Sequence, residues 1–195
     1  MYLLNKGLVE NYIEQELIKI ENFEKNNLFS TFYYFRLGNS ASVWDREKQK
    51  YNKIRLDNNI ESNLIIPPNG YALIKSFEKF SLSPKIYATI GQISDLPSSG
   101  LQLNCSPTID PLFTGYLELG LVNILNREAE IPIHSDIGKI VFYDIGDTPI
   151  KSIIGEKIKT KFKRRENLDI PESIEEYRNI GEIRNTFQDN ARRDV

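Results

Sequence analysis

Between residues 64 and 146 the sequence is a succession of short apolar segments separated by turn signals. The clearest turns are Pro-Pro-Asn-Gly at 67–70, the Pro- and Ser-rich stretch at 94–100, and Asp-Pro-Leu-Phe-Thr-Gly at 110–115. No helix of ten residues fits between these segments, which disfavours a parallel α/β sheet. The spacing predicts a mainly β protein, a β-sandwich or jelly-roll-like barrel with mostly antiparallel pairing.

The segments before residue 64 predict additions to this β core. Apolar residues recur at helical spacing over 7–20, so we expect one amphipathic helix there. The aromatic-rich stretch 28–38 predicts a strand that ends in a turn at Gly38. Residues 39–63 are polar and predict a hairpin or an excursion from the core, and we expect Trp44 to anchor it rather than to serve as a ligand-stacking ring.

After about residue 150 the pattern changes again. A basic run, Lys-Ile-Lys-Thr-Lys-Phe-Lys-Arg-Arg, covers 157–165. Pro171 then suits the first turn of a helix whose apolar stripe extends to Phe187. We therefore expect one domain over 1–165 and a C-terminal helical tail over 166–195. The tail either packs on the body or binds a partner protein.

Composition excludes several classes of protein. With 40% hydrophobic and 27% charged residues the chain is an ordinary globular protein, and a net charge of -2 is unlike the basic footprint of a general duplex-binding protein. One cysteine and one histidine exclude an internal disulfide and multi-Cys or His-rich metal sites. Both residues, Cys105 and His134, are expected to pack rather than to react. The charged N-terminal segment is neither a signal peptide nor a membrane span, so we expect a cytoplasmic protein.

Three segments, Phe-Arg-Leu-Gly-Asn at 35–39, residues 66–94 and residues 108–123, carry motifs in a recognisable order. Together they resemble the dCTP deaminases, which are relatives of the trimeric dUTPases. Phe-Arg-Leu-Gly-Asn at 35–39 is similar to their Arg-Leu-Gly-Asn segment, and residues 66–94 resemble the stretch that ends in their Gly-Arg-Ser-Ser motif. Residues 108–123 resemble their Ile-Asp-Pro-Gly-aromatic-x-Gly segment and the strand after it, which ends in asparagine. The spacing from Gly91 to Asp110 also matches, and the resemblance covers roughly residues 3–165.

The resemblance implies a homotrimer with nucleotide sites at subunit interfaces, and a C-terminal segment that folds over a site. It places Asp110 near a deoxyribose hydroxyl, with the aromatic Phe113 in the same segment, and Ser94 at a phosphate. Lys161 and Phe162 fall near the family's Lys-Tyr pair. No resident cofactor is implied, although Mg²⁺ can accompany a bound triphosphate.

Each of these residues also has a plain structural interpretation. Asp110 precedes a proline and is a good turn-initiating residue, and Ser94 can cap a turn. The run 157–165 can be a solvated basic face. These alternatives stay open at the level of sequence.

The sequence departs from the family where deamination needs a proton carrier. The resemblance places the family's glutamate three residues before the strand-ending asparagine, here Asn123, and that position is Gly120. Glycine cannot carry a proton. Glu118 lies two residues earlier on the same face of an extended strand, roughly 7 Å away.

The phosphate motif is altered as well. Gly-Arg-Ser-Ser is Gly-Gln-Ile-Ser here, so Gln92 takes the place of the arginine and remains the candidate contact, while Ile93 replaces a serine. A further family arginine aligns with Pro97. Zinc-dependent deamination lacks its His and Cys ligands.

Two functions follow. The first is a non-catalytic trimer that binds a nucleotide or nucleotide-derived ligand as a sensor, sequestering protein or scaffold. The second is an active dCTP deaminase or dUTP diphosphatase with a rearranged site that uses Glu118 or Asp110. The missing catalytic groups favour the first.

Overall fold

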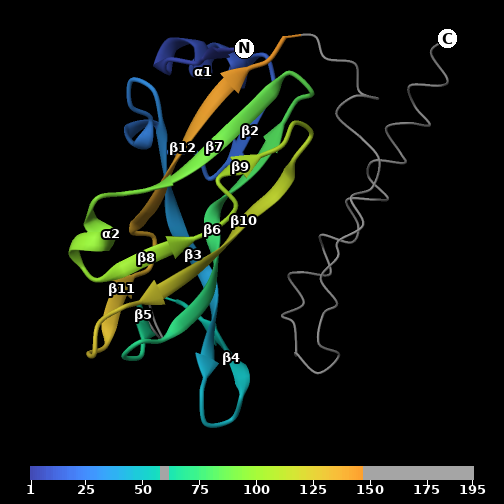
Figure 1. Ribbon diagram of the computed structural model, residues 1–195. Helices are drawn as coiled ribbons and strands as arrows, with labels where there is room; N and C mark the ends of the chain where they lie inside the picture. Colours follow the sequence, from blue (N-terminus) through green and yellow to red (C-terminus); the bar gives the residue numbers. More distant parts are fainter. Residues whose placement is uncertain (58–61, 147–195) are drawn as a thin grey trace, which may run out of the picture.

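The computed structural model describes residues 1–57 and 62–146, and the predicted basic run, the C-terminal helix, Lys161 and Phe162 lie outside these ranges. In the described part, ten antiparallel strands form a twisted main sheet that curls into an open half-barrel, with the helix α1 at one end (Figure 1). The predicted mainly β fold is confirmed. No helix among the described residues has the length and apolar character needed to cross a membrane.

The described chain contains strands and short helices in the following order. They are β1 (Tyr2–Leu3), α1 (Lys6–Glu14), β2 (Ile18–Glu21), the 3-10 helix η1 (Lys25–Asn27), β3 (Tyr33–Asp45), β4 (Lys50–Arg55), β5 (Asn63–Ile66), β6 (Tyr71–Leu82), β7 (Ile86–Gln92), α2 (Asp95–Ser98), β8 (Leu101–Asn104), β9 (Thr108–Ile109), β10 (Thr114–Asn123), β11 (Ala129–Pro132) and β12 (Asp136–Asp144).

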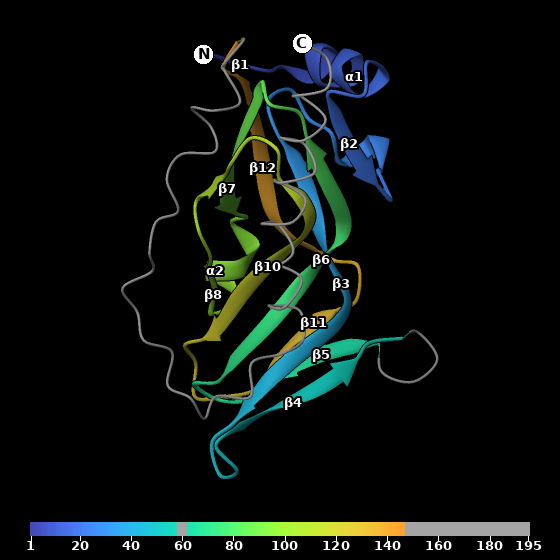
Figure 2. The same cartoon turned by 90° about the vertical axis from the view of Figure 1, so that its right-hand side faces the viewer.

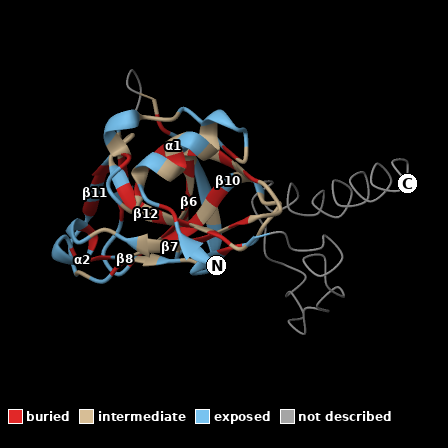
Figure 3. Cartoon of the chain, turned by 90° about the horizontal axis from the view of Figure 1, so that it is seen from above, coloured by how far each residue is buried: buried red, intermediate tan, exposed pale blue. Residues whose placement is uncertain are grey.

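The main sheet follows the order β8-β10-β6-β3-β12-β7-β9. Strands β1, β2 and β4 are added to it by pairing with β12, β6 and β3, and β5 and β11 form a separate pair. Because β3 pairs with β12 in its first half and with β6 and β4 in its second, it carries the sheet around the curl. Seen along the molecule, the buried segments gather inside this curl (Figure 3).

Strand β6 shows how the sequence sets the two faces of the sheet. Its side chains alternate without exception between buried and half-buried, as expected for an extended strand. The buried set, which includes Ala72, Ile74, Phe80 and Leu82, joins the core inside the curl. The half-buried set faces outward and includes Tyr71, which matters for the site below.

The N-terminal helix is shorter than predicted. Asn5 caps α1 by accepting a hydrogen bond from Leu8 N at 3.1 Å, and Glu16, with φ at 58°, ends the helical path. The predicted extension to residue 20 is wrong, because Ile18 begins β2 opposite Leu82 and is fully buried. The pairing of β2 with β6 therefore overrides the helical spacing of the apolar residues after Glu16.

The segment 28–38 is also divided differently. Phe29 N donates to Phe32 O at 2.9 Å, so the first residues form a turn and β3 starts afterwards. Gly38 is inside β3 and not in the predicted turn. A Cβ at this position would lie 2.7 Å from Ser76 O, so glycine is needed where β3 crosses β6 closely.

The predicted hairpin within 39–63 is present. Strand β3 continues past the body of the sheet and returns as β4 (Figure 2). The rings of Trp44 and Tyr51 lie opposite each other on the two strands, 5.0 Å apart. The expectation that Trp44 anchors this excursion is confirmed.

A buried ion pair ties β3 to β6. Glu78 is 0% exposed, and its carboxylate accepts from Arg36 Nε at 2.7 Å and from Arg36 N at 2.9 Å. Tyr33 donates its hydroxyl to the same carboxylate at 3.4 Å, and burial raises the pKa of Tyr33 to about 12. Arg36 also donates to Asn22 O at 2.7 Å. The charged groups are therefore satisfied, as burial demands.

A second polar cluster joins the N-terminus to the end of β12. Asp144 Oδ2 accepts from Tyr12 at 2.6 Å and Tyr2 at 3.1 Å, and Oδ1 accepts from Gly146 N at 2.6 Å. Burial opposes ionisation of Asp144, but the hydrogen bonds from Tyr12, Gly146 and Tyr2 outweigh it and hold the pKa of this carboxyl below its usual range.

Because of Asp144, the free energy of unfolding should fall with pH in the acidic range. Because its pKa is lowered by folding, its contribution is present above the unfolded pKa of about 3.9 and is lost as pH falls through the folded value. We expect Asp144→Asn to lower the free energy of unfolding by about 1–3 kcal/mol at pH 7, and the difference from wild type to shrink below pH 4. Urea titrations of both proteins across pH 3–7 check this. A difference that stays constant over that range would contradict it.

Candidate functional site

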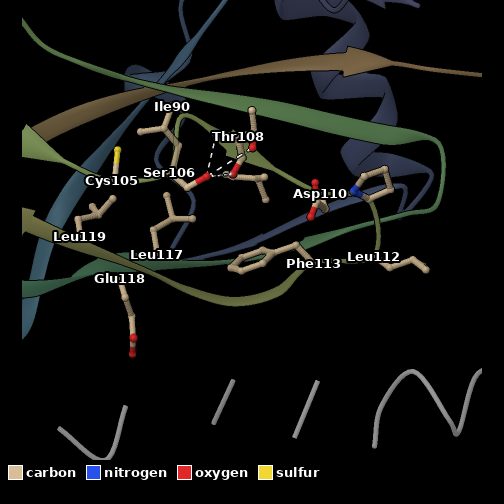
Figure 4. A pocket seen from close by; sticks show the side chains of 12 residues that line it. Ile90, Cys105, Ser106, Thr108, Asp110, Leu112, Phe113, Leu117, Glu118 and Leu119 are labelled. Atoms are coloured by element: carbon tan, nitrogen blue, oxygen red, sulfur yellow. Dashed lines mark hydrogen bonds between the residues drawn. The ribbon is translucent and has the colours of Figure 1, made fainter. Parts of the chain in front are cut away.

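A pocket of ≈ 340 Å³ opens beside the turn, residues 110–113, that joins β9 to β10. Its walls come from β7, β9, β10 and the loops between them, and most of its lining is apolar (Figure 4). The polar groups on it are hydroxyls and carboxylates, from Ser106, Thr108, Asp110 and Glu118. The size and chemistry suit a small ring system that presents hydroxyl groups.

Asp110 and Phe113, both predicted from the sequence, lie on this pocket together. Phe113 N donates to Asp110 O at 3.2 Å, so the backbone carbonyl closes the turn, helped by Leu112 at a φ of 68°. The side chain of Asp110 is exposed at the rim. The turn and the sugar contact are therefore compatible, because they use different atoms of the same residue.

Glu118 also borders the pocket, but it already has a partner. Its carboxylate lies 3.6 Å from Lys75 Nζ across the β6–β10 pair, and the side chain points away from Leu117 and Leu119 (Figure 4). Glu118 pairs with Lys75 and Gly120 pairs with Leu73, so the two residues share one face of β10, as predicted, and this is the outward face. The ion pair holds the Glu118 carboxylate beside Lys75 rather than over position 120.

The space next to Gly120 is filled by Tyr71. A Cβ added to Gly120 would lie 2.5 Å from Tyr71 Oη and 2.8 Å from Tyr71 Cε2. Tyr71 comes from β6, where it pairs with Val122, and its ring leans across the glycine. Burial raises the pKa of Tyr71, and the nearby Tyr51 raises it further. The group beside position 120 is thus a neutral phenol at neutral pH.

The remaining predicted contacts lie elsewhere. Gln92 ends β7, and its Oε1 accepts from Leu103 N at 3.3 Å. Ser94 precedes α2, is exposed, and makes no side-chain cap. Pro97 is exposed in α2, and Ile93 packs against the core. None of these four residues lines the pocket of the same chain. The assignment of Gln92 and Ser94 as nucleotide contacts stays a prediction.

Cys105 and His134 pack as expected. Cys105 lies half-buried on the pocket wall, and burial raises the pKa of its thiol. The His134 ring contacts Phe77 with centroids 4.0 Å apart, and Nε2 is 2.8 Å from Asn39 Oδ1. Within the described ranges no three His, Cys, Asp or Glu side chains gather closely enough to hold a metal ion.

Comparison with known proteins assigns the family. The family model described as dCTP deaminase-like matches residues 3–145. The chain belongs to the dCTP deaminase-like family. This membership confirms the resemblance, and with it the relation to the wider dCTP deaminase and dUTPase superfamily.

The similar proteins in this family are named dCTP deaminases. That of Helicobacter hepaticus is 22% identical over 178 residues, covering 87% of this chain and 92% of the relative. That of Pyrococcus horikoshii is 29% identical over 137 residues, covering 70% and 81%. The solved 2'-deoxycytidine 5'-triphosphate deaminase of Agrobacterium tumefaciens superimposes with a TM-score of 0.59 at 15% identity, over 72% of this chain and 47% of that structure. This likeness supports the same fold.

Asn123, the asparagine at the end of β10 that corresponds to the family's strand-ending asparagine, has a structural role in this chain. Asn123 is fully buried, and its Nδ2 donates to the carbonyl oxygens of Ile66, Pro67 and Arg127 at 2.7–3.1 Å. Its Oδ1 accepts from Leu125 N at 3.0 Å. These bonds fix the end of β10 and so fix the register that sets Gly120 beside Tyr71.

The sequence did not reveal Tyr71 or Lys75 as parts of the site. Both lie on β6, within the stretch 66–94 that resembles the family and well before the segment 108–123 that carries Asp110 and Gly120. Only the pairing of β6 with β10 places them beside Gly120 and Glu118. The strict alternation along β6 shows which of its residues face outward, but not which residue of another strand they meet.

Proposed function

We propose that this dCTP deaminase-like protein is a homotrimer that binds a nucleotide or nucleotide-derived ligand and does not deaminate it. The observation that carries the proposal is the pair Gly120 and Tyr71. At the position of the family's proton-carrying glutamate the chain has no side chain, and a neutral phenol occupies the adjoining volume. A phenol with a raised pKa is poorly suited to exchange protons with a pyrimidine near pH 7.

The pocket supports binding. Asp110 lies exposed at its rim, where a carboxylate can accept a hydrogen bond from a sugar hydroxyl. Phe113 and the apolar wall offer a surface for a base. Gln92 and Ser94 lie outside this pocket, so in a trimer they would act on a neighbouring chain's ligand. Mg²⁺ would enter only with a bound triphosphate.

A second candidate is an active enzyme with a rearranged site. It is favoured by one observation, that Asp110 and Glu118 both border the same pocket. Such an enzyme would use one of them to carry a proton or to orient water. The Lys75 ion pair argues against Glu118, because the carboxylate would have to leave it to act.

Calorimetric titration tests binding and its site. With dCTP or dUTP in the presence of Mg²⁺, we expect one site per chain and a loss of about 10- to 100-fold in affinity for Asp110→Asn, since a charge-assisted hydrogen bond contributes about 1.5–3 kcal/mol. Glu128→Gln, which neutralises an exposed carboxylate outside the pocket, is the matched control and should bind normally. Native mass spectrometry of the same sample should give three chains. Absence of binding, or equal binding by Asp110→Asn, would count against the proposal.

A further inference from the structure

The β3–β4 hairpin projects beyond the body of the protein (Figure 2). It is rich in basic residues. Between residues 44 and 55 it carries two acidic residues and five exposed basic ones, in a chain whose net charge is -2. The basic residues are Arg46, Lys48, Lys50, Lys53 and Arg55. This protruding element therefore has a formal charge of +3 (five basic minus two acidic residues), although the chain as a whole is slightly acidic.

Two of these cations share a face with an aromatic pair. The register sets Tyr51 opposite Trp44, and side chains two residues apart on a strand point to the same side. Lys53 and Arg55 therefore lie on the face that carries the two half-buried rings. The rings meet edge to face, with centroids 5.0 Å apart and planes at 66°.

The turn of the hairpin is held in one conformation. Asp45 accepts hydrogen bonds from Glu47 N and Lys48 N, each at 3.0 Å, and from Asn52 Nδ2 at 3.1 Å. The backbone hydrogen bond from Lys48 is the main reason that the pKa of Asp45 is lowered to about 2. The basic side chains thus project from a pre-formed support, which lowers the entropic cost of binding.

Protection of an edge strand explains only part of this pattern. Lysines on an exposed edge discourage pairing with other chains, and β4 pairs only with β3 among the described strands. That role accounts for Lys50 and Lys53. It does not require an aromatic pair on the face of Lys53. In the turn, Arg46 donates to Asn69 O and Lys48 Nζ lies 3.4 Å from Asp45 Oδ2, so these two cations also have a role in holding the hairpin.

We propose that this hairpin binds single-stranded nucleic acid. The cations contact backbone phosphates, and an unstacked base packs against the Trp44–Tyr51 pair, which is how many proteins bind single strands without reading sequence. A duplex keeps its bases stacked, so it should bind more weakly. The inference does not depend on nucleotide binding at the Asp110 pocket, because the two regions share no residue.

Tryptophan fluorescence tests this directly, because Trp44 is the only tryptophan in the chain. Titration with dT12 or U12 at 50 mM salt should quench the emission. With three or four phosphate contacts, raising the salt to 200 mM should weaken binding by roughly 10- to 50-fold. The double variant Lys50→Ala/Arg55→Ala should bind at least 10-fold more weakly and with a shallower salt slope. Lys19→Ala, which removes an exposed cation from β2, should bind like wild type.

A third variant, Tyr51→Leu, separates stacking from charge. We expect it to weaken binding of the single strands several-fold while the salt slope stays the same. No quenching at 50 mM salt would overturn the proposal. Equally tight binding of a duplex of the same length would also overturn it, and so would unaltered binding of the single strands by Tyr51→Leu. Binding of anionic lipid vesicles but not of the oligonucleotides would overturn it as well.

Discussion

Glu78→Ala should lower the free energy of unfolding by about 3–5 kcal/mol, the usual cost of leaving one member of a buried ion pair without its partner. Glu78 is completely buried and accepts from both the guanidinium and the backbone N–H of Arg36. Its removal leaves those donors and the O–H of Tyr33 without this acceptor at the junction of β3 and β6, while the Tyr33 oxygen still accepts from Glu24 N. Urea unfolding followed by circular dichroism measures the change.

Two further variants make this result specific. Arg36→Met/Glu78→Leu removes both charges and should recover much of the loss, because a buried pair can often be replaced by apolar groups of similar volume. Lys19→Ala breaks the exposed Lys19–Glu16 pair and should cost well under 1 kcal/mol. If Glu78→Ala were as mild as Lys19→Ala, the pair would not have the structural role described.

Gly120→Glu should destabilise the protein by about 1–3 kcal/mol, because a side chain at this position collides with the ring of Tyr71. Tyr71→Ala vacates the space. The double variant Tyr71→Ala/Gly120→Glu should therefore be more stable than the sum of the two single changes predicts, by about 1 kcal/mol or more. Urea titrations of the four proteins give this coupling energy.

Gly91→Ala is the matched control for the glycine substitution. Gly91 is also in a strand, but a Cβ there would meet only the flexible side chain of Lys139, at 3.2 Å. We expect a small effect. Additive behaviour of Tyr71→Ala and Gly120→Glu would mean that the ring does not hold the space beside position 120.

The β core could be predicted because its signal is local. Turn residues and short apolar runs mark the strands after residue 64 without any knowledge of their partners. The element boundaries that were predicted wrongly depend on which strands pair with each other. Leu17 and Ile20 continue the apolar spacing of the helix, yet Ile18 pairs with Leu82, and Gly38 resembles a turn although it lies where β3 crosses Ser76. Long-range pairing decides such cases.

The same distinction applies to the site. Asp110 and Phe113 could be predicted because they lie in one short segment with recognisable spacing. The absence of a side chain at Gly120 was also visible. The sequence did not show that Tyr71 fills the space beside Gly120, because Tyr71 reaches that space only through the register between β6 and β10. A shift of one residue in this pairing would turn Tyr71 to the other face.

Mass spectrometry of dCTP and dUTP after incubation with the purified protein and Mg²⁺ decides whether the protein binds nucleotides without altering them. We expect both nucleotides to be recovered unchanged under conditions in which calorimetry shows them bound, with neither dUTP formed from dCTP nor dUMP from dUTP. Repeated turnover by the wild-type protein, abolished in Asp110→Asn or Glu118→Gln, would contradict it and would identify an active enzyme with a rearranged site.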